Sequence, residues 1–272
     1  MQDGHVHTEW SWDTVTGAMT GSCERAIECG LGSIAFTEHA DLSPWAIPAR
    51  LRSELPEHFR VLLSAEGILT APVLDVTGYL AAIAECRDRF PGLLVLSGVE
   101  LSEPHWHAEQ AGALVRSGDF DRVLGSVHAL RGAAGNLLVD TLQGRRDPGQ
   151  LVRDYLGEAL LLAESDAAFE VLAHVDYPLR GWPDGDVRGF EEEFRAVLRA
   201  LARSGRVLEV NTRITPSAEI VRWWHEAGGR AVAFGSDAHD PLDVARRFAD
   251  AAAMVAAAGF APNDEPHGFW LR

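Results

Sequence analysis

The chain has 272 residues, of which 47% are hydrophobic and 24% are charged, a composition that excludes a disordered or low-complexity protein. Its formal net charge is −16, which argues against a standing nucleic-acid partner because there is no general excess of cations to replace backbone counterions. An anionic substrate would also be repelled unless bound cations reversed the local sign. The composition therefore directs attention to metal ligands.

The cysteines and the N-terminus predict a cytoplasmic protein. Cys23, Cys29 and Cys86 are odd in number and lack CxxC spacing, and MQDGHVHTEW has neither a basic start nor an apolar stretch. The apolar run at 251–260 is far shorter than the roughly 20 residues that a spanning helix needs, so we expect no membrane association. The sequence makes no prediction of the oligomeric state.

Short apolar runs alternate along the chain with segments of helical periodicity. The predicted strands lie at 4–7, 33–37, 93–99, 122–127, 169–174, 207–211 and 231–235, and the clearest helices at 21–30, 76–90, 149–165 and 190–205. Helix starts are expected at Asp75, Asp147 and Pro216, and helix ends at Gly30, Gly205 and Gly228. Strands that are apolar throughout and separated by helices predict a parallel α/β sheet covered on both faces.

No repeat, linker or break in composition divides the chain, so residues 1–272 are expected to form one domain. A closed α/β barrel explains seven strands best, and an open doubly wound sheet is the alternative. Two irregular stretches, 38–74 and 129–147, follow strands at positions where lids and substrate loops are usually carried.

Histidines and acids gather where the predicted strands end. His5 and His7 end the first strand, His39 and Glu100 follow the second and third, His128 and His174 end the fourth and fifth, and Asp237 and His239 follow the seventh. In α/β barrels that edge of the sheet is the active face. His5 and His7 are two residues apart, so on a strand their rings point to the same side and can bind one cation.

These segments resemble the polymerase and histidinol phosphatase (PHP) family. The matching motifs are DGHVHTEWSWD, FTEHAD, SGVEL, GSVHAL, AHVDYP and GSDAH, in the family's order, and they cover about residues 3–240. The resemblance implies a distorted (β/α)7 barrel with a trinuclear metal centre.

The resemblance also implies which residues hold each metal. The first metal would be held by His5, His7, Glu100 and Asp237, and the second by Glu100 as a bridge with His128 and His174. The third would be held by Asp13, His39 and His239. Asp13 stands where many family members have histidine, so this chain departs from the family pattern at the third position.

Three divalent ions and three ionised carboxylates would leave a local charge of about +3, enough to attract a phosphate ester. Mixed imidazole and carboxylate ligands suit Zn²⁺, Fe²⁺ or Mn²⁺ better than Ca²⁺ or Mg²⁺. The predicted reaction is hydrolysis of a phosphomonoester by a metal-activated hydroxide, with catalysis dependent on Glu100, His128, Asp237 and His239.

Further residues near the strand ends are candidates for supporting roles. Arg131, Arg180 and Arg213 follow strands four, five and six and are predicted to bind phosphate oxygens, or else to be solvated surface charges. Glu38 and Asp41 flank His39 and are expected to orient it, and Asp176 and Asn211 either support the site or cap turns. His58, His105, His107, His225 and His267 fall outside the motifs and are expected to have structural or surface roles.

The chain length and the insertion after strand two look most like the histidinol-phosphate phosphatases of the family, so L-histidinol phosphate is the predicted substrate. A phosphodiesterase or nucleotidase acting on short oligonucleotides or nucleoside phosphates is one alternative. A non-catalytic metal-binding module is the other.

Overall fold

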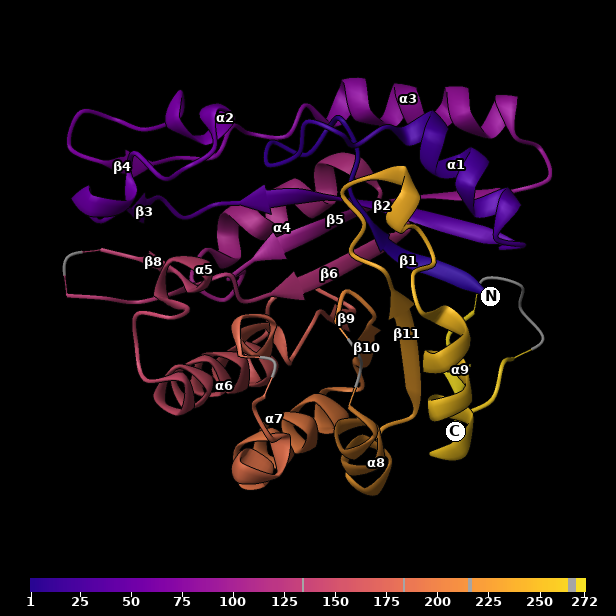
Figure 1. Ribbon diagram of the computed structural model, residues 1–272. Helices are drawn as coiled ribbons and strands as arrows, with labels where there is room; N and C mark the ends of the chain where they lie inside the picture. The colour runs from indigo at the N-terminus through magenta and orange to yellow at the C-terminus, as the bar shows by residue number, and fades with distance from the viewer. Residues whose placement is uncertain (134, 183, 215–216, 264–267) are drawn as a thin grey trace.

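The computed structural model describes residues 1–133, 135–182, 184–214, 217–263 and 268–272 as a curled sheet surrounded by helices (Figure 1). The sheet has the order β1-β2-β5-β6-β9-β10-β11-β12, and all of its pairings are parallel except that of β12 with β11. Its strands are β1 Gln2–Val6, β2 Ser33–Asp41, β5 Leu94–Ser102, β6 Arg122–Ser126, β9 Val171–Leu172, β10 Val207–Asn211, β11 Ala231–Gly235 and β12 Trp270–Leu271.

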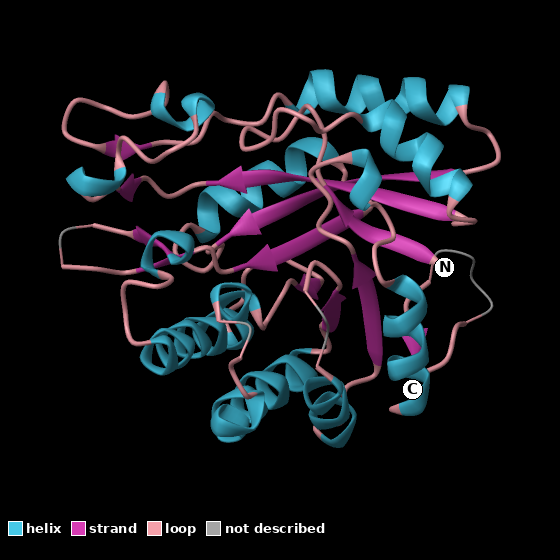
Figure 2. Cartoon of the chain, in the orientation of Figure 1, coloured by secondary structure: helices cyan, strands magenta, loops and turns pink. Residues whose placement is uncertain are grey.

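Helices cover the outside of this sheet, as the parallel topology requires. In Figure 1, α1 and α3 lie along the side of β1 and β2, and α6 to α9 lie along the side of β9 to β11; Figure 2 shows the same two helical layers in cyan. The α-helices are α1 Met19–Glu28, α2 Glu57–Arg60, α3 Val76–Arg89, α4 Ala108–Gly118, α5 Val139–Leu142, α6 Pro148–Glu164, α7 Glu191–Ser204, α8 Ala218–Glu226 and α9 Phe248–Ala257. Short 3-10 turns are η1 Ala49–Leu51, η2 Tyr177–Gly181, η3 Val187–Phe190 and η4 Pro241–Asp243.

The sheet closes on itself at the end of β1. The amide of His7 donates to the carbonyl of Ala238 at 2.8 Å, and the amide of Asp237 donates to the carbonyl of His5 at 2.8 Å. These bonds join the first strand to the segment that follows β11, so the predicted barrel is confirmed and the open sheet is not. The closure also brings His5 and Asp237 together.

Several strands differ from the predicted ones. β2 and β5 run on to Asp41 and Ser102. His39 and Glu100 therefore lie inside these strands, whereas the sequence predicted them to follow the strands. β9 has only two residues, and the antiparallel β12 was not predicted. The strands β2 and β5 extend because they pair with each other over nine consecutive residues, which the apolar pattern of either segment alone does not reveal.

The predicted helix boundaries rest on identifiable caps. The side chains of Asp75 and Asp147 accept hydrogen bonds from the amides of Gly78 and Gln150, in the first turns of α3 and α6. α7 ends at Gly205, whose φ of 73° is in the left-handed region that glycine adopts without strain. The start predicted at Pro216 lies outside the described residues.

The two irregular stretches form a separate small lobe at the arrowhead end of the sheet (Figure 1). It contains the hairpin of β3 Trp45–Ala46 with β4 Ile68–Leu69 and the hairpin of β7 Ala129–Leu130 with β8 Leu137–Leu138. A small apolar cluster that includes Trp45, Leu69 and Ala129 holds the two hairpins together. The lobe therefore stands beside the carboxyl ends of the parallel strands.

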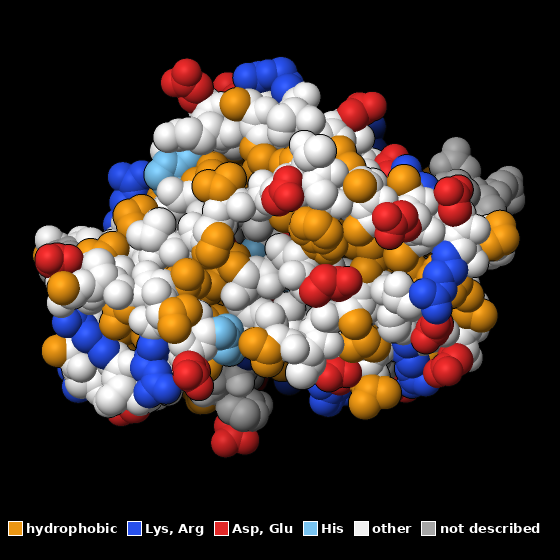
Figure 3. Space-filling view, turned by 90° about the horizontal axis from the view of Figure 1, so that it is seen from above, with side chains coloured by type: hydrophobic (Ala, Val, Ile, Leu, Met, Phe, Trp, Pro, Cys, Tyr) orange, Lys and Arg blue, Asp and Glu red, His pale blue; other side chains and the backbone are white. Residues whose placement is uncertain are grey.

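Within the described residues, none of the helices has the length and apolarity needed to cross a membrane. The face of the molecule seen in Figure 3 carries acidic and basic side chains interspersed over the described residues.

Candidate metal centre

The barrel gathers the predicted ligand residues at one end. His5 lies in β1 and His7 directly after it, and His39 in β2 stands next to Glu100 in β5, its register partner. The remaining residues come from the segments after β6, β9 and β11, namely His128, His174, Asp237 and His239. Side chains separated by more than two hundred residues thus face one another.

Glu100 lies at the centre of the cluster and is fully buried. Its Oε2 is 3.4 Å from His5 Nε2, 3.5 Å from His7 Nε2 and 3.1 Å from His39 Nδ1. Its Oε1 is 2.8 Å from His174 Nε2 and 3.3 Å from His128 Nε2. One carboxylate therefore approaches five imidazoles, which is the geometry of a group shared between cations.

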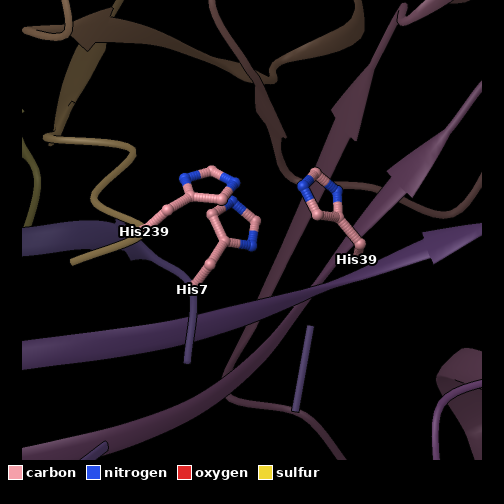
Figure 4. Close-up of side chains that lie close together, drawn as sticks. All are labelled: His7, His39 and His239. Atoms are coloured by element: carbon pink, nitrogen blue, oxygen red, sulfur yellow. The ribbon is translucent and has the colours of Figure 1, made fainter. Parts of the chain in front are cut away.

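A second part of the cluster lies around Asp13 and nearer the surface. Asp13 Oδ2 is 2.9 Å from His239 Nε2 and 3.3 Å from His39 Nε2. The ring of His7 stacks on that of His39 with 4.1 Å between centroids and lies 4.3 Å from that of His239 (Figure 4). The Asp13 carboxylate thus lies beside His39 and His239, and its role as a metal ligand remains a prediction.

Asp237 completes the inner part of the cluster. Its Oδ1 is 3.5 Å from His7 Nε2 and 3.8 Å from His5 Nε2, while its Oδ2 accepts a hydrogen bond from Arg180 Nη2. The backbone φ angles of Asp237 and His174 are 55° and 26°, in the left-handed region that non-glycine residues rarely adopt. Such backbone strain is typical of functional sites, where the surrounding structure holds it in place.

The donor set fits divalent cations. There are four groups of three residues in which the three donor atoms lie within 4.8 Å of one another. The groups are His7, His39 and His239; His5, His7 and Glu100; His5, His174 and Asp237; and His39, Glu100 and His128. Glu100 Oε2 is buried without a hydrogen-bond partner among the described residues, which is costly unless a cation lies beside it. Imidazole and carboxylate donors together suit borderline metals.

Protons and metals compete for these nitrogens. Burial lowers the pKa of His128, but Glu100 and Asp41 outweigh that effect and raise the pKa to about 10. Burial opposes charge on His5 as well, and the carboxylates of Glu209, Glu100 and Asp237 still raise its pKa well above the usual value. A proton on His5 can bridge its Nε2 to that of His7, 3.0 Å away, and a cation would replace that proton.

Groups behind the histidines fix their orientation. Ser11 Oγ donates to Glu38 at 2.6 Å and lies 3.1 Å from His7 Nδ1, so it accepts the proton of that nitrogen. Ser102 Oγ lies 2.7 Å from His128 Nδ1. In both rings the Nε2 atom is therefore left to face the cluster.

The two acids that flank His39 act on other residues than predicted. Glu38 accepts from the hydroxyls of Thr8 and Ser11, and its hydrogen bonds do not include His39. Asp41 Oδ2 accepts from Trp12 Nε1 at 2.7 Å but lies 3.9 Å from His39 Nδ1, too far for a hydrogen bond. Alternation of side chains along β2 explains the result for Glu38, because Glu38 and His39 point to opposite faces. Asp41 is on the same face as His39, but its Oδ1 lies nearer to His128 Nδ1, at 3.5 Å.

A cavity of about 330 Å³ opens onto the cluster. Arg180 and Arg213 lie in its wall beside Asp237, and Arg213 Nη1 is 2.9 Å from His239 Nδ1. Arg131 packs over the ring of Trp106 at 4.7 Å and is not part of this lining. A phosphate-binding role for the three arginines remains a prediction, with the first two placed closest to the cluster.

His105 and His107 stand apart from the cluster, whereas His58 Nε2 lies 3.2 Å from the backbone carbonyl oxygen of Asp13. His105 Nε2 and Trp106 Nε1 lie 2.6 Å and 2.7 Å from Glu158 Oε1 on α6, and His107 Nε2 lies 2.7 Å from Ser43 Oγ. These contacts fasten loops, consistent with the structural role predicted for both histidines. His267 lies outside the described residues.

The chain is similar in sequence to a known protein family and to several of its members. Residues 3–213 match the PHP domain. A probable histidinol-phosphatase of Deinococcus radiodurans is 30% identical over 266 residues, which cover 92% of this chain and 90% of that protein. A probable histidinol-phosphatase of Clostridium acetobutylicum is 27% identical over 268 residues, which cover 93% of this chain and 92% of that protein.

A solved structure shares the fold. The histidinol phosphate phosphatase of Lactococcus lactis, complexed with zinc, L-histidinol and phosphate, superposes with a TM-score of 0.75 at 21% identity, covering 95% of this chain and 93% of that chain. The chain belongs to the PHP domain family, and the relatives that match it along most of its length carry the name histidinol phosphatase.

Proposed function

We propose that this protein is a metal-dependent phosphatase that hydrolyses L-histidinol phosphate to L-histidinol and phosphate. The observation that carries the proposal is the buried Glu100 carboxylate among five imidazoles, two of which, His39 and His128, line a cavity together with Arg180 and Arg213. The names of the relatives and the zinc, L-histidinol and phosphate in the Lactococcus structure support the same reaction.

Two or three divalent ions, of zinc, iron or manganese, would be held as the resemblance implies. His5, His7, Glu100 and Asp237 would hold the first, Glu100, His128 and His174 the second, and Asp13, His39 and His239 the third. When bound, such ions polarise phosphoryl oxygens and make a water molecule acidic enough to attack phosphorus.

The protein's own groups bind and orient the phosphoryl group. Arg180 is fixed by Asp237, by Asn211 Oδ1 at 3.2 Å and by the ring of Tyr177 beneath its guanidinium at 4.4 Å. Its Nε is buried without a hydrogen-bond partner among the described residues, and the side chain lines the cavity that would receive the phosphoryl group. Arg213 supplies a second cation at the same wall.

The rest of the cavity suits a cationic, aromatic leaving group. Trp12 and Trp45 stack with 5.6 Å between ring centroids, and Phe59 lies 4.9 Å from Trp12, so one wall is aromatic. The wall also contains the carboxylate of Asp140, which accepts from the hydroxyl of Tyr177. L-Histidinol carries an imidazole and an ammonium group, for which stacking and a carboxylate are complementary.

The test combines elemental analysis of the purified protein with phosphate release from L-histidinol phosphate before and after chelation. Two or three metals per chain and release that chelation abolishes would support the proposal. A mononucleotide and a phosphodiester serve as comparison substrates, and faster turnover of either would overturn the assignment to histidinol phosphate. Bound metal without turnover of any ester would favour a binding module instead.

A further inference from the structure

The strand β10 contributes a buried carboxylate behind the cluster, although it supplies none of the predicted metal ligands. Glu209 is 4% exposed and lies among groups that donate hydrogen bonds. Its Oε1 is 2.7 Å from His5 Nδ1, and its Oε2 accepts from the backbone amide of His174 at 2.7 Å and from Asn211 Nδ2 at 3.1 Å.

Two of these contacts require Glu209 to accept. The amide of His174 and the Nδ2 group of Asn211 are always donors, so Oε2 is an acceptor. When the Nε2 atom of a neutral His5 binds a cation, the ring carries its proton on Nδ1, and Oε1 of Glu209 at 2.7 Å is the acceptor of that proton. That proton fixes the ring, so the Nε2 atom of His5 points toward His7 Nε2 and Glu100 Oε2.

The same carboxylate also holds the strained turn of His174. The φ angle of His174 is 26°, and its amide bond to Glu209 fixes the backbone at that residue. The ring then reaches Glu100 Oε1 at 2.8 Å. Glu209 thus connects two histidines from distant parts of the chain that approach different oxygens of Glu100.

The space that Glu209 needs is kept open by a glycine. A Cβ atom added at Gly235 would lie 2.0 Å from Glu209 Oε1 and 2.6 Å from His5 Cβ. Any side chain at this position of β11 would displace the carboxylate or the imidazole. Glycine at position 235 therefore leaves the space in which the Glu209 carboxylate contacts the His5 ring.

We propose that Glu209 is a positioning residue of the metal centre, which sets the tautomer of His5 and the backbone of His174 so that both rings present Nε2 to the cations. The inference rests on the proposed function only in that the cluster holds metal. It adds a role for the sixth parallel strand of the barrel.

The decisive variant is Glu209→Gln, which keeps the shape of the side chain but replaces one acceptor oxygen by an NH₂ donor. The amide can then satisfy either His5 Nδ1–H or the His174 amide, but not both. We expect metal affinity, measured by competition with a chelator, to fall about 10- to 100-fold, as for other groups that orient metal ligands. With Co²⁺ in the site, the visible absorption spectrum should shift because the ligand geometry changes.

A matched control is Glu158→Gln, which alters a carboxylate on α6 that also contacts a histidine and a tryptophan, neither of which belongs to the cluster. It should leave the affinity and the Co²⁺ spectrum unchanged. Gly235→Ala should resemble Glu209→Gln although it leaves the carboxylate in the sequence. Thermal unfolding of the metal-free variants identifies any that fail to fold.

Histidine ¹⁵N resonances of the zinc-loaded wild-type protein test the tautomer without any variant. A proton on His5 Nδ1 is expected, with the signal assigned by its loss in His5→Asn. A protonated Nε2, or a Glu209→Gln protein with wild-type metal affinity and Co²⁺ spectrum, would overturn the proposal. Failure of the proposed function is distinguishable, because wild-type protein would then bind metal tightly without hydrolysing histidinol phosphate.

Discussion

The substitution Glu100→Gln tests the centre of the proposed site. The change preserves side-chain volume, removes one negative charge and turns one ligating oxygen into a donor that faces imidazole nitrogens between 2.8 and 3.5 Å away. Because Glu100 is fully buried, no water can take the place of the lost acceptor without rearrangement. The binding of both cations that are proposed to share this carboxylate should therefore be weakened.

The size of the effect follows from the position of the residue. Groups that only orient metal ligands change affinity by about 10- to 100-fold, so loss of a ligating oxygen should cost at least about 100-fold, or roughly 2.7 kcal/mol, per shared metal. At a metal concentration that just saturates the wild-type protein, we expect fewer metals per chain and at least about 100-fold lower kcat. Elemental analysis and phosphate release measure the two quantities on one sample.

The refuting result is equally concrete. A folded Glu100→Gln protein that keeps the wild-type metal content and more than a tenth of the wild-type kcat would show that Glu100 is not a shared ligand. The Glu158→Gln protein is the matched control, since it loses a partly buried carboxylate that contacts a histidine outside the cluster.

Three other outcomes follow from the same geometry. Asp140→Asn should raise KM for L-histidinol phosphate about fivefold, the effect expected for loss of one solvent-exposed charge contact. The KM for phenyl phosphate, which has no ammonium group, should not change. Equal changes in KM for both esters would exclude a contact between Asp140 and the ammonium group. Arg180→Lys keeps the charge beside Asp237 but loses the planar fork, so inhibition by inorganic phosphate should weaken about tenfold, whereas Arg195→Lys on the outer surface should not change it. Burial lowers the pKa of His128, but the adjacent carboxylates outweigh burial and raise the pKa to about 10. Metal binding at pH 7.5 should therefore release protons, and metal affinity should fall as the pH falls. Calorimetry in buffers of different ionisation enthalpy measures the protons released, and a value of zero would contradict this prediction.

Much of the fold was predictable because its strands are buried on both faces. Continuous apolar runs such as AVAFG at 231–235 have no polar alternation to obscure them, and the helix caps at Asp75 and Asp147 are local features. The lengths of β2 and β5 were not predictable in this way. Their last residues, EHAD and ELS, include charged side chains that become strand only because each segment pairs with the other.

The residues that orient the ligands were harder to find. Glu209 lies in the middle of an apolar strand, and an unpaired charge there is improbable unless something in the fold satisfies it, which is the one signal that the sequence offered. Its partners, His5 and His174, lie 204 and 35 residues earlier in the chain, and nothing in the sequence around them indicates the contact. For Glu38 the sequence suggested the wrong partner, because adjacent strand residues face opposite sides.

By itself the sequence determined which residue types stand at the ends of the strands, since motif order and residue spacing are properties of the chain alone. Only the tertiary structure decided which of them meet. The closure of β1 against the segment after β11 brings Asp237 within 3.8 Å of His5 Nε2, and the pairing of β2 with β5 sets His39 beside Glu100. The physical reason is that contact depends on strand order, register and barrel curvature, which arise from backbone pairing between segments far apart in the chain.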